Sequence, residues 1–495
     1  MSTRLDAHRR LDDLSALQRD VFDVLVVGGG VTGAGVALDA ASRGLSVALV
    51  EKSDLAAGTS RWSSKLAHGG LRYIVAGQVG VAWESAVERN HLVRTIAPHL
   101  IRPMRFVIPD LAGYPRGNKA LARTGFAVAD VLRVAARTPS ALPGTRWVDA
   151  REARGLVPAL RADARGAFVT VDGALEDDAR LVVAIARTAA GHGARIVTHC
   201  QAQQVSRDGA RVRDELSGAE FDVRARVVVA AAGVWSGGLV AGVPLQPSKG
   251  AHVLLRAEAL DNPKSAFNIL VPGSRNRFVF AVPRPDGTVQ VGLTDDAVET
   301  IDDEPQVTVD EETFLLATLS SGLGRAVTPS DVVGRFAGLR PLLGHTDGAS
   351  AADLSRRHAL LDRDGVLVLV GGKLTTYRRM AQDAVDLVGR RLGVTRACRT
   401  TALALVGAGT SGGPVVAHGR LHRRFGAEAA DVAAMGPAEP LAPGLPALRC
   451  EVEWAVRAEG AVSVADVERR LRLDLVPDWA KAARPYVDEV LSSRS

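Results

Sequence analysis

The chain has 495 residues, 47% of them hydrophobic, and a formal net charge of +6, which together indicate a globular protein of two or three domains. No apolar run reaches the roughly 20 residues that a membrane-spanning helix needs. Only 4% of the residues are aromatic and the basic residues form no long run, so the positive charge does not indicate nucleic-acid binding. The scattered cysteines Cys200, Cys398 and Cys450 have no metal or redox spacing. We therefore predict no metal site and a cytoplasmic location.

Residues 1–20 form an N-terminal extension with the pattern of a short helix. Leu5, Leu11, Leu14 and Leu17 lie on one side of that helix. We expect this side to pack on the body of the protein; contact with a membrane surface is the alternative.

A strand, a glycine turn, a helix, a second strand and an acid follow in that order. Strand 23–27 is apolar and β-branched, as a buried parallel strand is. Gly28 allows the tight turn, Gly30 lets the backbone approach a pyrophosphate, and Gly33 lets the helix pack on the strand. Glu51 ends the second strand, near the spacing of an acid that binds a ribose hydroxyl. The unit predicts dinucleotide binding at a helix N-terminus.

Further alternation of strands and helices continues this pattern. We predict helices at 80–97, 116–136, 179–191, 374–392 and in 451–491, and strands at 194–199, 203–206, 225–231, 366–370 and within 251–293. Rossmann-type pieces therefore recur and are interrupted by two insertions. This arrangement favours FAD over NAD, because a flavin stays bound and several chain segments must return to meet it.

The predicted fold class is α/β, with a Rossmann-type FAD-binding domain interleaved with an α+β substrate domain, plus a C-terminal helical domain. The predicted boundaries are 21–61, 132–233 and 342–394 for the FAD-binding domain, 62–131 and 234–341 for the substrate-binding domain, and 395–495 for the helical domain.

Three motifs resemble the FAD-dependent (aerobic, quinone-linked) glycerol-3-phosphate dehydrogenases: Gly58–Tyr73, Gly338–Leu342 and Gly371–Arg378. Segments 249–252 and 292–295 resemble them more weakly. The resemblance implies oxidation of sn-glycerol 3-phosphate to dihydroxyacetone phosphate by hydride transfer to bound FAD. It also implies that electrons pass to ubiquinone or menaquinone, with the protein held peripherally on the inner face of the cell membrane. The resemblance is also compatible with a homodimer.

The same motifs indicate which residues contact the cofactor. A helix N-terminus at 373–376 would face the flavin pyrimidine ring and stabilise its reduced anion. The full predicted set is Gly28, Gly30, Gly33, Glu51, Thr59, Ser60, Ser64, Lys65, Gly69, Gly70, Gly233, Gly372, Leu374 and Thr375.

Oxidation of the substrate needs a base for the hydroxyl proton and cations for its phosphate and for the developing alkoxide. His68 and His252 are the candidate bases, and Arg340 and Lys373 the candidate stabilising cations. The resemblance assigns the substrate to Arg72, Tyr73, Thr294 and Arg356.

Two positions depart from the family's usual pattern. Ala231-Ala232-Gly233 stands where a threonine often precedes the glycine, and Arg61-Trp62 is bulkier than the residues often found in its loop. Both departures concern the details of flavin contact.

Three alternatives remain open on the sequence. One is a glycerol-3-phosphate oxidase that uses oxygen. The second is an amino-acid oxidase of the same architecture, whose site would grip a carboxylate. The third is a flavin-bearing protein without enzymatic activity.

Overall fold

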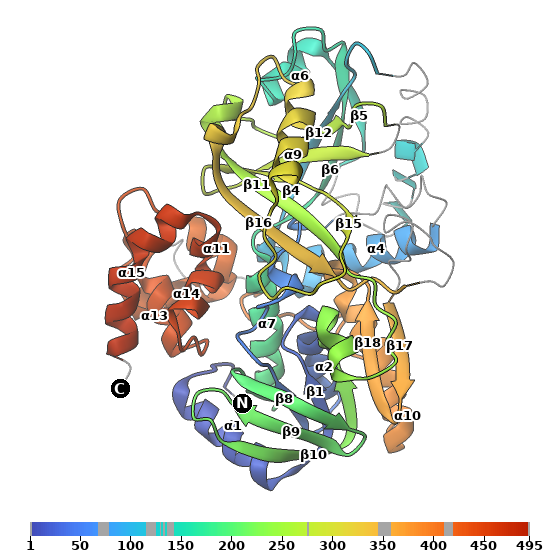
Figure 1. The fold of residues 1–495 in the computed structure, drawn as a ribbon, viewed down its shortest axis with the longest axis vertical. Helices are drawn as coiled ribbons and strands as arrows, with labels where there is room; N and C mark the ends of the chain where they lie inside the picture. The colour runs from blue at the N-terminus through green and yellow to red at the C-terminus, as the bar shows by residue number, and fades with distance from the viewer. Residues whose placement is uncertain are drawn as a thin grey trace.

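The computed structural model describes residues 2–67, 79–114, 125–128, 130–131, 134–135, 143–274, 277–344, 358–409 and 419–493. Two β-sheets with their helices lie one above the other in Figure 1, and a helical C-terminal unit lies beside them. Among these residues, no helix is long and apolar enough to cross a bilayer. The predicted class, a Rossmann-type part interleaved with an α+β part and followed by a helical unit, is confirmed.

The first sheet carries the predicted strand–turn–helix unit. Within the described residues it has eight strands, in the order β17-β18-β10-β1-β2-β7, and β9 joins it beside β10 with β8 at its edge. The bounds are β1 Val21–Val27, β2 Val47–Val50, β7 Arg195–Val197, β8 Cys200–Ser206, β9 Gly209–Asp214, β10 Glu220–Ala230, β17 His358–Arg363 and β18 Val366–Gly371. β1 is parallel to both β2 and β10, and β10 is parallel to β18. Their carboxyl ends therefore meet at one edge, where ligands of such sheets bind.

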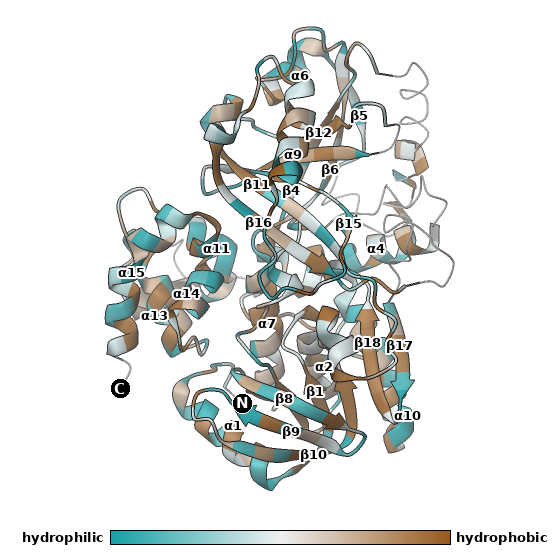
Figure 2. Ribbon diagram, viewed as in Figure 1, coloured by the Kyte–Doolittle hydropathy of each residue, from teal (hydrophilic) through white to brown (hydrophobic). Residues whose placement is uncertain are grey.

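Helices cover one face of this sheet with a continuous apolar core. They are α2 Val31–Ser42, α7 Asp178–Gly191 and α10 Tyr377–Leu392. Figure 2 shows hydrophobic residues gathered on β1 and β18, as buried parallel strands require. The predicted helices at 179–191 and 374–392 are confirmed, and so are the six predicted strands of this sheet, although their ends differ by a few residues.

The second sheet is mixed and has ten strands among the described residues, in the order β15-β11-β14-β13-β12-β4-β6-β3, with β16 beside β11 and β5 beside β6. The bounds are β3 Leu66–Ala67, β4 Ile101–Pro109, β5 Arg146–Asp149, β6 Gly166–Leu175, β11 Ser248–Arg256, β12 Ala266–Leu270, β13 Phe278–Pro283, β14 Thr288–Gly292, β15 Asp296–Ala297 and β16 Val332–Arg340. Helices α6 Ala150–Leu156 and α9 Val309–Ser321 accompany it.

One expected boundary differs from the structure. The sequence pattern places 132–233 in the FAD-binding domain, but β5 and β6 pair in the second sheet. β6 runs antiparallel to β4 from Ala167 to Leu175. The sequence pattern predicts no strand at 166–175, and the pairing of β6 with β4 is set by a register that no local pattern carries.

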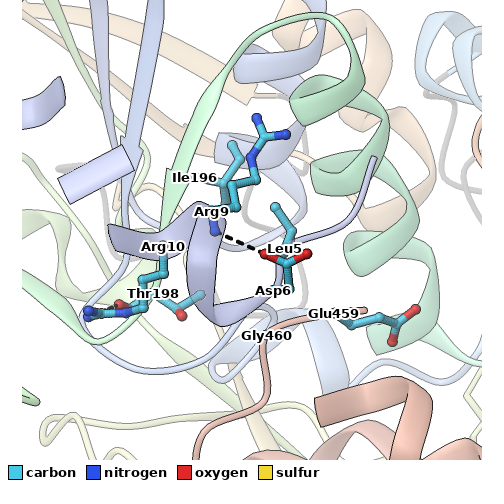
Figure 3. A pocket seen from close by; sticks show the side chains of 8 residues that line it. All are labelled: Leu5, Asp6, Arg9, Arg10, Ile196, Thr198, Glu459 and Gly460. Carbon is cyan, nitrogen blue, oxygen red and sulfur yellow. Dashed lines mark hydrogen bonds between the residues drawn. The ribbon is translucent and has the colours of Figure 1, made fainter. Parts of the chain in front are cut away.

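The N-terminal extension forms helix α1 Ala7–Arg19, which packs on the first sheet. Leu5 and Leu17 are buried as expected, but Leu11 is 67% exposed. A small hollow lies where this segment meets the sheet edge and the C-terminal unit. Figure 3 shows Asp6 capping the helix through the backbone N–H of Arg9, at 2.9 Å. The hollow is thus a seam between packed elements.

Helix α4 Val79–His91 continues into a π turn, Leu92–Ile96, across the predicted helix 80–97. Of the predicted helix 116–136, the described residues 125–128, 130–131 and 134–135 are helical. Another short helix, α8 Ser236–Leu239, follows β10.

The C-terminal unit is helical, as predicted, and it has its own apolar cores. Its helices are α11 Gly419–Phe425, α12 Ala429–Met435, α13 Arg449–Arg457, α14 Val464–Leu471 and α15 Pro477–Ser492.

Buried ion pairs join this unit to α7. Arg180 donates two hydrogen bonds to Glu459, at 2.6 and 2.5 Å, and Arg187 donates a third at 3.2 Å. Trp454 Nε1 donates to the same carboxylate at 2.7 Å. Burial by itself would raise the pKa of Glu459, but Arg180 and Arg187 outweigh it and lower the pKa to about 2. The carboxylate is therefore charged at neutral pH and fully bonded.

We expect Glu459→Ala to lower the free energy of unfolding by about 3–5 kcal/mol, because it leaves two buried guanidinium groups without their shared anion. Urea unfolding followed by circular dichroism measures the loss. Glu439→Ala is the matched control, since Glu439 and its partner Arg449 are 57% and 38% exposed. A surface pair contributes less than about 1 kcal/mol. Equal losses in both variants would contradict the assignment.

Candidate active site

The glycine turn between β1 and α2 leaves no room for side chains. Gly28 has φ +112°, and a Cβ there would lie 2.6 Å from the Ala231 carbonyl oxygen at the end of β10. A Cβ on Gly33 would lie 1.9 Å from the carbonyl oxygen of Gly28. The backbone of α2 therefore sits directly on β1, as the sequence predicts for a dinucleotide-binding turn.

The N-terminus of α2 suits an anion. Its first turn carries no acidic residue, and its cap is a glycine. The Ser60 hydroxyl accepts a hydrogen bond from the Val31 N–H at 2.9 Å, so the loop after β2 reaches this helix end. Free N–H groups and the helix dipole favour a phosphate here.

Glu51 lies at the same turn, and its carboxylate accepts hydrogen bonds from the backbone N–H groups of Gly29, at 2.6 Å, and Ser53, at 2.9 Å. Burial raises the pKa of Glu51. The carboxylate thus shapes the turn, and its contact with a ribose stays a prediction.

A second helix start lies at the end of β18. Gly371 and Gly372 have φ values of +78° and +74°, and a 3₁₀ turn, Leu374–Thr376, leads into α10. Lys373 Nζ donates to the hydroxyl of Ser85 on α4 at 2.8 Å. This contact attaches α4 to the predicted flavin-facing turn.

Gly233, at the end of β10, has φ +56°, and a Cβ added there would meet no atom within 4 Å. The space beside it is open, on the edge where the parallel strands end. A planar ligand could approach the backbone there.

The loop that follows β2 connects the two sheets. Thr59 donates its hydroxyl proton to the Leu339 carbonyl of β16 at 2.6 Å. Farther along, the Ser64 hydroxyl and His252 Nε2 form a hydrogen bond of 3.3 Å. The carboxyl edge of the first sheet is thereby placed against β16 and β11 of the second.

Lys65, in the same loop, is buried and points to α7. Its Nζ donates to Asp178 at 3.2 Å, and the Ser63 hydroxyl donates to the same carboxylate at 2.7 Å. Burial lowers the pKa of Lys65 to about 8, against the opposing charge of Asp178. The Lys65 side chain therefore anchors the loop to α7. A contact between Lys65 and the cofactor would use the backbone.

His252 lies in a row of residues that crosses four strands of the second sheet. It is directly opposite Phe336 on β16 and Gly292 on β14, and Gly292 is opposite Phe280 on β13. Its ring stacks on Phe336 at 4.6 Å and 12°. A Cβ on Gly292 would lie 2.3 Å from the imidazole, so only glycine leaves the ring its space.

Burial lowers the pKa of His252 well below its usual value, and the charges of Lys65 and Arg340 lower it further. The imidazole is therefore neutral at physiological pH. A neutral imidazole can accept a proton, which a base in this site must do.

Arg340 ends β16 on the same face. Its guanidinium crosses Gly250, where a Cβ would lie 2.1 Å from Nη2, and donates to Asp295 at 3.0 Å and to Ser248 at 3.2 Å. It also donates to the Thr294 carbonyl at 3.2 Å. These bonds hold the guanidinium in one orientation.

The Thr294 hydroxyl is engaged within the protein. It accepts from the Ala251 N–H at 3.0 Å and donates to Glu311 at 3.3 Å. Glu311 also pairs with Lys249 at 3.0 Å. A substrate contact by Thr294 stays a prediction.

The structure brings together His252, Arg340, Thr294, Ser64 and Lys65, and it places Lys373 separately, at the end of β18. Six predicted site residues lie outside the described residues: His68, Gly69, Gly70, Arg72, Tyr73 and Arg356.

Sequence reasoning missed the partners of the site residues. Asp295 is the last residue of the weaker motif 292–295, which is a usable signal. The sequence pattern places Asp178 at a helix N-terminus, and the structure shows that it also reaches Lys65. Ser85 and Phe336 carry no local signal.

Comparisons with known proteins identify the family of the chain. A family model described as FAD dependent oxidoreductase matches residues 23–387. A second, described as the C-terminal domain of alpha-glycerophosphate oxidase, matches residues 398–494. "Glycerol-3-phosphate dehydrogenase 1" of Mycobacterium tuberculosis is 48% identical, with 99% of each chain covered.

Two solved structures are similar in fold. The glycerol-3-phosphate dehydrogenase of Bacillus halodurans complexed with FAD has a TM-score of 0.76 and 26% identity, covering 98% of this chain and 94% of that one. The L-alpha-glycerophosphate oxidase of Mycoplasma pneumoniae with FAD bound has a TM-score of 0.58 and 19% identity, covering 78% and 99%.

We expect Gly33→Ala to lose most of its bound FAD, because the new methyl group would push α2 away from β1. Overpacking of this kind also costs about 1–3 kcal/mol of stability. Visible absorbance per polypeptide and the Tm measure the two effects. Gly155→Ala, in α6, is the control, because a Cβ there meets nothing within 4 Å. A Gly33→Ala protein with full FAD content would refute the role of this contact.

Proposed function

This chain belongs to the family of FAD-dependent glycerol-3-phosphate dehydrogenases, and we propose that it oxidises sn-glycerol 3-phosphate to dihydroxyacetone phosphate. Its cofactor is FAD. The observation that carries the proposal is the placement of His252 and Arg340 on one sheet face, against the loop that follows the dinucleotide-binding unit.

The residues present fit FAD. The glycine turn, the start of α2 and Ser60 would receive the pyrophosphate. The turn at 373–376 would face the flavin ring, and Gly233 leaves space beside it. When bound, FAD supplies the two-electron acceptor for the hydride that leaves C2 of the substrate.

His252 is the base that we favour among the described residues. Its neutral imidazole would take the proton from the C2 hydroxyl as the hydride leaves, so that one proton and one hydride account for the oxidation. His68 remains the second candidate, on the motif alone. An arginine base is excluded by its pKa.

Arg340 would orient the substrate hydroxyls and stabilise negative charge on O2. Asp295 and Ser248 already fix its direction, so little reorganisation is needed when charge develops. Lys373 would act from the flavin side. We propose that Arg72, Tyr73 and Arg356 bind the phosphate, which rests on the motif alone.

The electron acceptor in our proposal is a quinone at the inner face of the cell membrane. Val128, Val131 and Val134 are 38%, 67% and 55% exposed, at a spacing that puts them on one side of a helical segment. Such an apolar side suits an interfacial helix. The family model of the C-terminal region is described for an oxidase, so oxygen is the competing acceptor.

Anaerobic addition of sn-glycerol 3-phosphate to the purified yellow protein tests the proposal. We expect the oxidised flavin absorbance to disappear, whereas an amino acid leaves it unchanged. Mixing the reduced protein with a soluble quinone should restore the colour quickly. Bleaching by an amino acid alone would overturn the substrate, and fast peroxide formation with oxygen would overturn the acceptor.

We expect Arg340→Met to slow flavin reduction by roughly 10²-fold, as loss of an oriented charge donor does. Stopped-flow absorbance at saturating substrate measures it. Arg335→Met is the control on the same strand, because Arg335 pairs with Glu312 and its side chain is 45% exposed. A normal rate in Arg340→Met would remove Arg340 from the site.

A further inference from the structure

The bulky pair Arg61-Trp62, a departure from the family's usual loop, lies where the C-terminal unit meets the candidate site. Arg61 is 1% exposed, and it pairs with Asp474 of the C-terminal unit and with Glu304, the latter at 2.7 Å. Its Nε donates to the Ala57 carbonyl at 2.8 Å. Because Arg61 is buried and bonded on both sides, it attaches the loop to the C-terminal unit.

Arg472 of the C-terminal unit approaches the same loop from the end of α14. It has a left-handed backbone, with φ +63°, and donates to the Arg61 carbonyl at 3.0 Å. Its guanidinium lies 5.3 Å from the centre of the Trp62 ring, and that of Arg61 lies 3.7 Å from it. The guanidinium groups of Arg61 and Arg472 therefore both make cation–π contacts with the Trp62 indole.

Trp62 connects Arg472 to the candidate base His252 through Phe336. Its ring stacks on Phe336 at 5.4 Å and 20°, and Phe336 stacks on His252 at 4.6 Å and 12°. A Cβ on Gly338 would lie 2.4 Å from the Cβ of Trp62, so the indole lies tightly against β16. Movement of Trp62 would displace Phe336 and, through it, the imidazole.

The far side of the loop is held by α7. Asp178 of α7 accepts from the Ser63 N–H at 3.0 Å and from Lys65 Nζ at 3.2 Å. Ser64, which is bonded to His252, lies between these two residues. The loop is thus fixed by α7 on one side and by the C-terminal unit on the other.

We propose that Arg472 and Trp62 are positioning residues for the reaction: the C-terminal unit sets the place of His252 through the stack Arg472–Trp62–Phe336–His252. The chemical consequence, a correctly placed base, rests on the proposed function. The structural consequence, an ordered loop 58–65, does not.

The experiment compares Arg472→Met, Trp62→Ala and Trp62→Phe in the FAD-loaded full chain. We expect the first two to lower the rate of flavin reduction by about 10-fold with KM nearly unchanged, because small misplacements of a reacting group are costly. Trp62→Phe keeps a stacking ring and should restore most of the rate. The double variant Arg472→Met/Trp62→Ala should lose no more than the single ones, since both break one chain of contacts.

Arg469→Met is the matched control. Arg469 also joins the C-terminal unit to the body, through Glu304 at 2.8 Å, and bonds neither Trp62 nor the Arg61 backbone. It should leave the rate unchanged. An equal loss in Arg469→Met would show that domain docking in general matters, and it would overturn the proposal.

Hydrogen exchange of the loop 58–65 gives a readout that needs no substrate. We expect faster exchange in Arg472→Met and Trp62→Ala, and wild-type exchange in Arg469→Met. If wild-type protein is not reduced by sn-glycerol 3-phosphate, the proposed function fails while this readout still tests the stack. Wild-type exchange and a wild-type rate in Arg472→Met would overturn the inference.

Discussion

The contact between Gly28 and Gly33 fixes how α2 begins at the predicted cofactor edge. At this point α2 rests on β1 with no side chain between them. The N-terminus of α2 is therefore directed at the edge where β1, β2 and β10 end, and α7 and α10 can pack along its length. A single added methyl group would tilt the helix and move its free N–H groups away from a phosphate. The constraint is steric, and it acts before any charge is considered.

Strand register determines which residues of the second sheet lie at this edge. The glycines of this sheet make room for side chains. Gly292 and Gly250 leave space for the side chains of His252 and Arg340, which lie on neighbouring strands. Arg340 is paired with Asp295, as Lys65 is with Asp178. A cation that already has its own carboxylate contributes direction more than net charge. In this half of the site, we therefore expect the cations to orient the substrate more than they add net charge.

The parts of the fold that sequence predicts are those that depend on near neighbours. The unit of β1, α2 and β2 is recognisable because a buried strand, a tight turn and an apolar helix each leave a local pattern. Asp177 caps α7, bonding the N–H of Arg180 at 3.2 Å, and this too is local. By contrast, the sheet to which β6 belongs depends on its pairing with β4, far away in the chain.

The candidate site divides in the same way. Its motifs name His252 and Arg340, but the partner of Lys65 lies 113 residues away and that of Lys373 lies 288 residues away. Arg61-Trp62 shows the limit most clearly. The sequence marks this pair as unusual, yet its meaning depends on a contact with Arg472, 411 residues from Arg61.

Charged side chains attach the C-terminal unit to the rest of the protein, although an apolar surface would hold the unit as well. Arg470 pairs with Asp54, at 2.7 Å through Nε, and Arg424 with Asp177 at 2.7 Å, all of them buried. Replacing buried ion pairs by hydrophobic residues is often neutral or stabilising, so such pairs are weak evidence for stability. Arg470 bonds Asp54, and Arg180 of α7 bonds Glu459, through two nitrogens each, and two parallel bonds add geometry because they tolerate little rotation. An apolar interface would let the unit slide against α7, whereas these pairs allow one orientation. Only a unit held in one orientation could keep Arg472 over Trp62.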